Sequence, residues 1–117
     1  MAIPSGSGTE VLKRAALNIT AADGDAKIID GVANHIYTVL SIFVFNDHAT
    51  DNAEIEIYVN ESATTPRKIV EGLPLIAANS TFVWNDKFVL TGTDELMVNT
   101  NKDNGYFYVS YIDQDWT

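Results

Sequence analysis

Hydrophobic and polar residues alternate along most of the chain with a period of two, which is the pattern of half-buried β-strands. The alternation is cleanest over residues 54–59. It predicts that Ile55, Ile57 and Val59 face a core, while Tyr58 and the two glutamates of this segment face outward. A helical period of 3.6 does not fit this segment.

Two other segments are less regular. Residues 11–20 fit either a strand or one face of a helix, and the strand is favoured because the rest of the chain is β. Residues 36–46 are apolar at nearly every position, which predicts a central strand buried on both sides, packed against a second sheet or against another chain. Strict alternation places Ile36, Leu40, Ile42 and Val44 on one face of this strand and Tyr37, Val39, Phe43 and Phe45 on the other.

Shorter strand segments follow at intervals of about ten residues, at 27–29, 67–70, 73–76, 81–90, 95–99 and 106–112. Pro74 predicts an edge strand, Asn85-Asp86 a tight turn or bulge, and residues 101–105 a hairpin. Roughly eight or nine short strands predict an all-β fold, a two-sheet antiparallel β-sandwich or jelly roll.

The first ten residues differ from the rest in composition. Pro4 disfavours a helix at Ile3, and Ser-Gly-Ser-Gly follows directly, so we expect an extended N-terminal arm over residues 1–10 and a single β-sandwich domain over residues 11–117. The arm hangs free or lies on a neighbouring subunit. Residues 1–6 have neither a basic start nor an apolar stretch, so we expect no signal peptide.

The charge balance narrows the function classes. The chain of 117 residues has 7 basic and 16 acidic side chains, a net charge of −9, and no cysteine. We therefore expect a protein without disulfides that binds neither nucleic acid nor an anionic membrane, since both attract clustered Lys and Arg.

Candidate catalytic and metal-binding residues match no working arrangement. His48 lies beside two aspartates but without the spacing of a metal site, and Asp23-Gly24-Asp25 lacks the remaining ligands of a calcium loop. Glu54 and Glu56 are neighbours on one strand face, whereas glycosidase acids come from opposite walls of a cleft. We expect no enzyme activity, no metal and no cofactor.

Aromatic residues are more numerous than a small core needs, which favours a contact surface for protein or carbohydrate. Those considered are Tyr37, Tyr58, Trp84, Tyr106, Phe107, Tyr108, Tyr111 and Trp116.

Three segments resemble small structural proteins encoded by tailed bacteriophages, especially those of marine and cyanobacterial hosts. They are residues 2–14 (AIPSGSGTEVLKR), 34–42 (NHIYTVLSI) and 77–84 (AANSTFVW), the last followed by LTGTD at 90–94. The resemblance spans most of the chain and rests on segments that form the fold, so it transfers no catalytic residue.

The resemblance implies a virion component on the capsid surface, made in the host cytoplasm. We expect a capsid decoration (cement) protein that bridges major capsid subunits and forms a homotrimer. A tail or neck component, such as an adaptor or a fibre-associated protein, and a host-glycan binding module are the alternatives. The candidate interface residues are Ile3, Pro4, Val11, Lys13, Arg14, Trp84, Tyr106 and Tyr108.

Overall fold

The computed structural model describes residues 9–102 and 105–116, without the side chains of residues 72–75. The predicted arm therefore lies almost wholly outside the described residues. The elements are β1 (Thr9–Ile19), the 3-10 helix η1 (Ala21–Asp23), β2 (Ala26–Asp30), β3 (His35–Asn46), β4 (Ala53–Glu61), β5 (Thr65–Ile76), β6 (Ser80–Trp84), β7 (Phe88–Thr91), β8 (Glu95–Thr100) and β9 (Gly105–Asp115).

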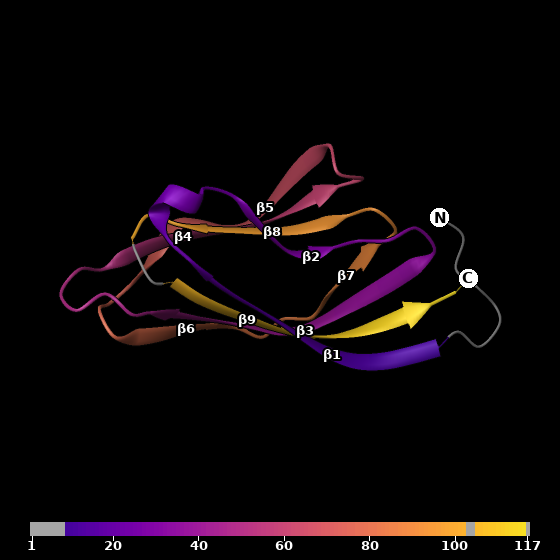
Figure 1. The fold of residues 1–117 in the computed structure, drawn as a ribbon, viewed down its shortest axis with the longest axis horizontal. Coiled ribbons are helices and arrows are strands. Elements are labelled where there is room, and N and C mark those ends of the chain that lie inside the picture. Colours follow the sequence, from indigo (N-terminus) through magenta and orange to yellow (C-terminus); the bar gives the residue numbers. More distant parts are fainter. Residues whose placement is uncertain (1–8, 103–104, 117) are drawn as a thin grey trace.

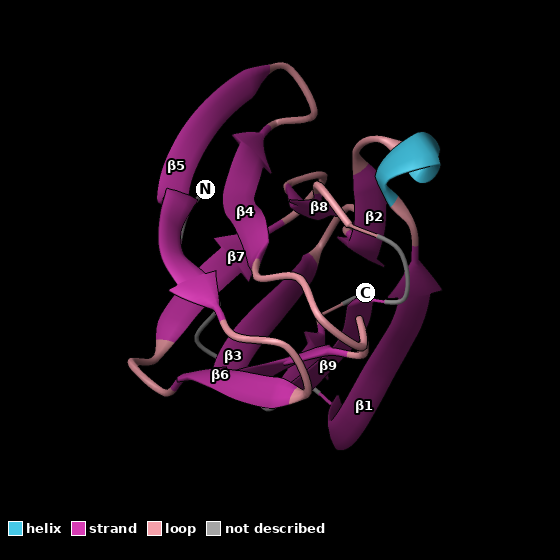
Figure 2. Ribbon diagram, turned by 90° about the vertical axis from the view of Figure 1, so that its left-hand side faces the viewer, coloured by secondary structure: helices cyan, strands magenta, loops and turns pink. Residues whose placement is uncertain are grey.

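The strands form two antiparallel sheets that pack face to face (Figures 1 and 2), which confirms the predicted two-sheet β-sandwich. Sheet A has the order β1-β9-β3-β6, with β7 also paired to β3, and sheet B has the order β2-β8-β4-β5. The chain changes sheet at every connection except β4–β5 and β6–β7. No helix in the described part of the chain is long and apolar enough to cross a membrane.

The core fills the space between the sheets with aliphatic and aromatic side chains from both. Its largest fully buried members are Phe107, Ile42, Ile55, Ile57, Leu90, Leu96, Val39, Val44, Val98 and Val109. The predicted inward positions of Ile55 and Ile57 are thus confirmed, and Val59 packs against the same core while remaining partly exposed. The hydrophobic effect favours this burial, because these side chains leave water without bringing in unpaired polar groups.

Residues 9–19 form a strand, as predicted over helix, although β1 begins at Thr9 and so includes two residues assigned to the arm. β5 is an edge strand, as Pro74 predicted. The break predicted at Asn85-Asp86 separates β6 from β7, and both of these strands pair with β3.

The predicted face assignment of residues 36–46 is wrong, because β3 contains a bulge. Val39 pairs with Tyr111 and Ser41 with Ser110, so Leu40 has no partner on β9. One extra residue shifts the alternation by one position. The inward set is consequently Tyr37, Val39, Ile42 and Val44, and the outward set includes Phe43 and Phe45.

The predicted hairpin at residues 101–105 is also wrong. β8 pairs with β2 and β4 in sheet B, whereas β9 pairs with β1 and β3 in sheet A. The strands before and after this segment therefore belong to different layers.

Candidate assembly surface

The outer face of sheet A, which points away from the core, exposes large apolar side chains. Phe43 lies between buried Ile42 and Val44, and Tyr108 lies between buried Phe107 and Val109, so both point outward. The same alternation turns three more residues to this face. The exposed fractions of the five are Leu12 72%, Phe43 44%, Val83 48%, Val89 55% and Tyr108 44%.

Strand register aligns these side chains in two rows that run across the sheet. Ala16 of β1 pairs with Tyr108 of β9, Tyr108 with Phe43 of β3, and Phe43 with Val83 of β6. We call these four residues the Phe43 row. The second row, the Leu12 row, is formed in the same way by Leu12, Ile112, Thr38 and Val89. Side chains directly opposite on neighbouring strands are close enough to touch, so each row is a continuous surface.

The described strands β3, β6, β7 and β9 place no charged side chain on this outer face. Besides the two rows, their outward residues are Ile36, Ser41, Phe45, Thr81, Thr91, Tyr106, Ser110 and Gln114. On a chain with a net charge of −9, an uncharged face across four strands is a marked local exception. Charged groups are usually absent from the centre of protein interfaces, because burying them without a partner is costly.

Charge returns at the two edges of the face. Glu10 points outward from the edge strand β1, where it accepts a hydrogen bond from Gln114 Nε2 at 2.9 Å. The cation Arg14 also points outward from β1, and the cation Lys87 lies in the segment between β6 and β7. Neither forms an ion pair with a residue that the structure describes, whereas Lys13, Lys27, Arg67, Lys68 and Lys102 each do.

The outer face of sheet B is different, because its polar groups bind one another. Tyr58 points outward, as predicted, yet only 8% of it is exposed. Its hydroxyl donates a hydrogen bond to Asp25 (2.8 Å), and the Lys68 ammonium lies 4.9 Å from the centre of its ring. Burial, followed by the hydrogen bond to Asp25, raises the pKa of Tyr58 to about 12.

Ion pairs extend this network over sheet B. Glu95 accepts contacts from Lys27 Nζ (2.7 Å) and from Asn60 Nδ2 (3.0 Å), and the contact with Lys27 is the main cause of its lowered pKa. Lys68 also binds Glu56, at 2.8 Å. A shallow pocket of about 230 Å³ nearby is lined by Glu54, Ile55, Glu56, Glu71, Asn99 and Asn101.

A third polar cluster ties β1 to the end of the core. Asp113 is 6% exposed and binds Lys13 Nζ at 2.8 Å and His35 Nδ1 at 2.7 Å. Burial alone would raise the pKa of Asp113, but the hydrogen bonds from Lys13 and His35 hold it below its ordinary value. Lys13 is therefore engaged within the chain.

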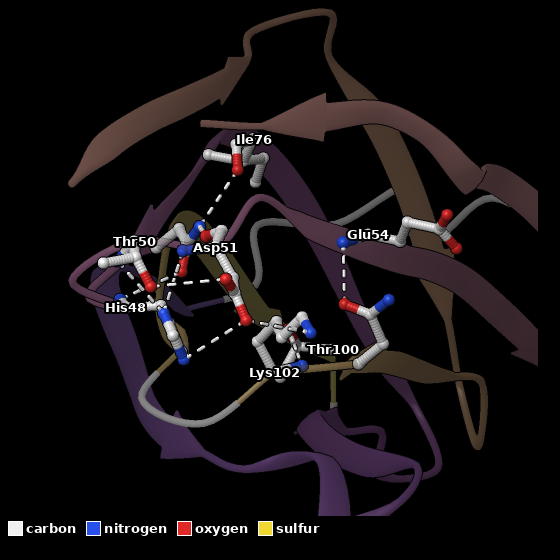
Figure 3. Close-up of polar contacts among 9 residues, drawn as sticks. His48, Thr50, Asp51, Glu54, Ile76, Thr100 and Lys102 are labelled. Carbon is white, nitrogen blue, oxygen red and sulfur yellow. Dashed lines mark hydrogen bonds and ion pairs between the residues drawn. The ribbon is translucent and has the colours of Figure 1, made fainter. Parts of the chain in front are cut away.

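The loop that contains His48 is a structural turn (Figure 3). His48 Nδ1 accepts hydrogen bonds from the backbone N–H groups of Thr50 (3.2 Å) and Asp51 (3.0 Å). Asn46 Nδ2 donates to the carbonyl oxygens of Asp51 and Ile76, both at 2.9 Å, and Lys102 binds Asp51 at 3.3 Å. Within the described residues, no group of three or more His, Asp or Glu could hold a metal ion.

The structure brings only some of the predicted interface residues to the outer face of sheet A. Arg14, Tyr106 and Tyr108 lie there, and the Tyr106 hydroxyl donates to Asp47 at 3.2 Å. Trp84 instead packs against the core, and its Nε1 donates to the carbonyl of Asp86 at 3.0 Å. The remaining predicted residues lie elsewhere: Val11 and Lys13 are on the opposite side of β1, and Ile3 and Pro4 are outside the described residues.

Four residues of the face were not predicted from the sequence: Leu12, Phe43, Val83 and Val89. The available signal was that residues 36–46 are apolar on both pleat faces. It indicated that the second face of this strand needs cover, and the structure shows that no part of the described chain fully provides it.

No protein-family model matches the chain, and no curated protein matches it. Solved structures do share its fold. A structure of Bacillus endospore appendages, a family of disulfide-linked pili, aligns with a TM-score of 0.55 at 18% identity and covers 100% of this chain and 97% of that one.

Two viral particles give comparable alignments. A chain of the acid-stable capsid of Helicobacter pylori bacteriophage KHP30 aligns with a TM-score of 0.56 at 8% identity, covering 91% of each chain. A chain of the infectious bursal disease virus particle aligns with a TM-score of 0.55 at 10% identity, covering 97% of this chain and 33% of that one. At such low identities these likenesses establish a shared fold.

Proposed function

We propose that the chain is a virion structural protein of the capsid decoration type, which bridges major capsid subunits on the outside of the head. It acts as a homo-oligomer, for which the sequence resemblance implies a trimer. Its work is done by buried contact area, without catalysis, metal or cofactor.

The observation that carries this proposal is the uncharged apolar outer face of sheet A. Monomeric proteins rarely expose a contiguous apolar patch larger than a few hundred Å². The Phe43 and Leu12 rows cross the whole sheet on either side of the polar residues Arg14, Ser110 and Ser41, and their exposed side chains support a surface that another protein covers. That is the requirement of a subunit in an assembly.

Two further observations support a place in a virion. The fold is shared with subunits of a phage capsid, an icosahedral virus and a pilus. The strand orders β1-β9-β3-β6 and β2-β8-β4-β5, with repeated crossing between the sheets, also support the jelly-roll form of the sandwich. Disulfide links such as those named for the pili are not available to a chain without cysteine.

Contact with the capsid is assigned to the N-terminal arm and the start of β1. Strand β1 is an edge of sheet A, so one side of its backbone is free to pair with a strand of another protein. Ile3 and Pro4 supply apolar anchors ahead of this strand, and Arg14 supplies a cation without a partner in the described chain.

Electron microscopy of the virion that contains the chain tests the proposal. A lattice of copies over the whole head supports it, whereas a single ring at the neck or tail, or absence from the particle, contradicts the decoration role. Binding to heads is then compared between the full chain, a variant without residues 1–8 and a variant with Ile3 and Pro4 changed to serine. Full binding by both variants would remove the arm from the mechanism.

A further inference from the structure

We infer that the outer face of sheet A is covered by the same face of a second copy, so that two sandwiches stack into a four-layer dimer. The inference rests on the homo-oligomer part of the proposed function and assigns it a surface. The face is defined by the outward side chains of β1, β9, β3, β6 and β7 described above.

The size of the face reaches the lower limit for a specific contact between two proteins. Its outward residues run from Tyr106 to Gln114 along β9, which at about 3.4 Å per residue is about 27 Å. Four strands side by side at about 4.8 Å give a width of about 19 Å. The two faces together then bury about 1,000 Å², which is about the area where specific interfaces begin.

The charge distribution favours a second copy over an unlike surface. Each copy carries a net charge of −9, but β3, β6, β7 and β9 contribute no charge to the face. The charges that β1 adds, Glu10 and Arg14, lie at the edge of the face, and Glu10 already accepts a hydrogen bond from Gln114. The centres of two such faces can therefore meet without burying an unpaired ion. Sheets in such a contact pack about 10 Å apart, as inside one sandwich.

The edge residues select one of the two symmetric arrangements. A twofold axis perpendicular to the strands would place Arg14 over Arg14, which is repulsive. A twofold axis parallel to the strands places β1 of one copy over β6 and β7 of the other. Arg14, Ser110 and Ser41 stand opposite one another on β1, β9 and β3. At the same level on the other side of β3, residues 85–87 connect Trp84, the partner of Ile42, to Phe88, the partner of Val39. Arg14 then opposes the segment 85–87, which carries Asp86 as well as Lys87 and so has no net charge, whereas the perpendicular axis opposes Arg14 to a cation alone.

An isologous contact of this kind closes at two copies. It therefore gives a dimer where the sequence resemblance implies a trimer, and a mass measurement decides between them. The capsid contact rests on the arm and the free backbone edge of β1 and shares Arg14 with this face. Loss of head binding by the arm variants and loss of the dimer by Val89→Lys therefore report on the two proposals separately.

Sedimentation equilibrium of the purified 117-residue chain tests the inference. We expect a dimer at micromolar concentration. Val89→Lys, which places a charge in the Leu12 row, should raise the dimer dissociation constant at least about 100-fold, because the ammonium group would be buried without a partner. Val32→Lys is the matched control, since Val32 and Val89 are 53% and 55% exposed and Val32 lies outside the face. It should leave the constant unchanged.

A charge exchange tests the orientation. Arg14→Asp and Asp86→Arg should each weaken the dimer, and the double variant should restore it to within about threefold. Circular dichroism confirms that each variant is folded. A monomer or a trimer at all concentrations, or equal weakening by Val32→Lys and Val89→Lys, would overturn the inference. Failure of the double variant to recover would overturn the parallel axis.

Discussion

The two outer faces of this sandwich differ in how their outward aromatic residues are covered. One belongs to a five-stranded sheet and the other to a four-stranded sheet of one small acidic chain, and both carry outward aromatic residues. On sheet B, Tyr58 is covered by Lys68 and hydrogen-bonded to Asp25 of the same chain, whereas on sheet A Tyr108 and Phe43 are open. Sheet B covers its outward aromatic residue within the chain, and sheet A leaves its outward aromatic residues exposed.

The comparison shows that the polarity of a residue and its burial are separate properties. Tyr58 and Met97 lie outside the core cluster and are each only 8% exposed. Lys68 lies over the ring of Tyr58, and Met97 stands between Lys27 and Tyr58 on the neighbouring strands. No comparable charged side chains flank Phe43 on its own sheet. A protein that bound the outer face of sheet B would first have to break ion pairs within the chain. A protein that bound the central strands on the outer face of sheet A would break none.

The largest expected difference is between two tyrosine truncations. Tyr58→Ala should lower the free energy of unfolding by about 3 kcal/mol, because it removes a buried ring and leaves Asp25 without its hydroxyl donor. Tyr108→Ala should cost about 1 kcal/mol or less, because the ring is already 44% exposed. Urea denaturation at a protein concentration that keeps both variants monomeric measures the two values. Equal losses would contradict the contrast between the faces.

Acid should act on the polar network of sheet B and on the Asp113 cluster, and not on the central outer face of sheet A. Hydrogen bonds from Asn99 and Tyr58 lower the pKa of Asp25, and those from Lys27 and Asn60 lower the pKa of Glu95. A lowered pKa in the folded state stabilises the fold above the ordinary carboxyl pKa, and this stabilisation is lost as the pH falls through the lowered value. Glu95→Gln should therefore reduce the difference in unfolding free energy between pH 7 and about pH 2.5 by about 1 kcal/mol.

Urea denaturation at the two pH values measures this difference. The free energy of face-to-face pairing should change much less between pH 7 and pH 5, since the central strands of sheet A place no titratable acid on that face. A steep loss of the dimer over that interval would contradict the uncharged character of the contact.

Salt should produce the smallest effect. Lys27→Met removes the ion pair between Lys27 and Glu95, in which the lysine side chain is about half exposed. We expect a slight decrease in the urea midpoint at low salt and almost none near 1 M salt, where exposed charges are screened. Dimerisation through sheet A should stay constant or strengthen over the same salt range. A midpoint shift that persists at high salt would mean that the Lys27 stem, and not its charge, stabilises sheet B.

Local pattern was sufficient for the strands and insufficient for their pairing. The alternation around Ile55 and Ile57 predicted their burial, because side-chain direction in a strand depends only on position. The hairpin at residues 101–105 failed because turn residues specify a reversal of the chain, while the partner of each strand is set by contacts distant in sequence. β8 finds β4 and β2, and β9 finds β3 and β1.

The site was predicted in the same partial way. An excess of aromatics pointed to Tyr106 and Tyr108, which do lie on the outer face of sheet A. Trp84 looked equivalent in the sequence, yet its position on β6 turns it toward the core. The hydrogen bond from Tyr58 to Asp25 could not be predicted from local pattern, because the two residues lie 33 positions apart along the chain.

The bulge at Leu40 changes which residues of β3 point into the core. Before it, odd-numbered residues of β3 enter the core, and after it, even-numbered residues do. If Leu40 instead paired with Ser110 in an unbroken ladder, Phe43 and Phe45 would turn into the core, and Ile42 and Val44 would turn outward. The space between the sheets would still be hydrophobic, but the outer face would be aliphatic beside Tyr108. One residue without a ladder partner on β9 therefore decides which side chains of an apolar strand are buried and which are exposed on the outer face of sheet A.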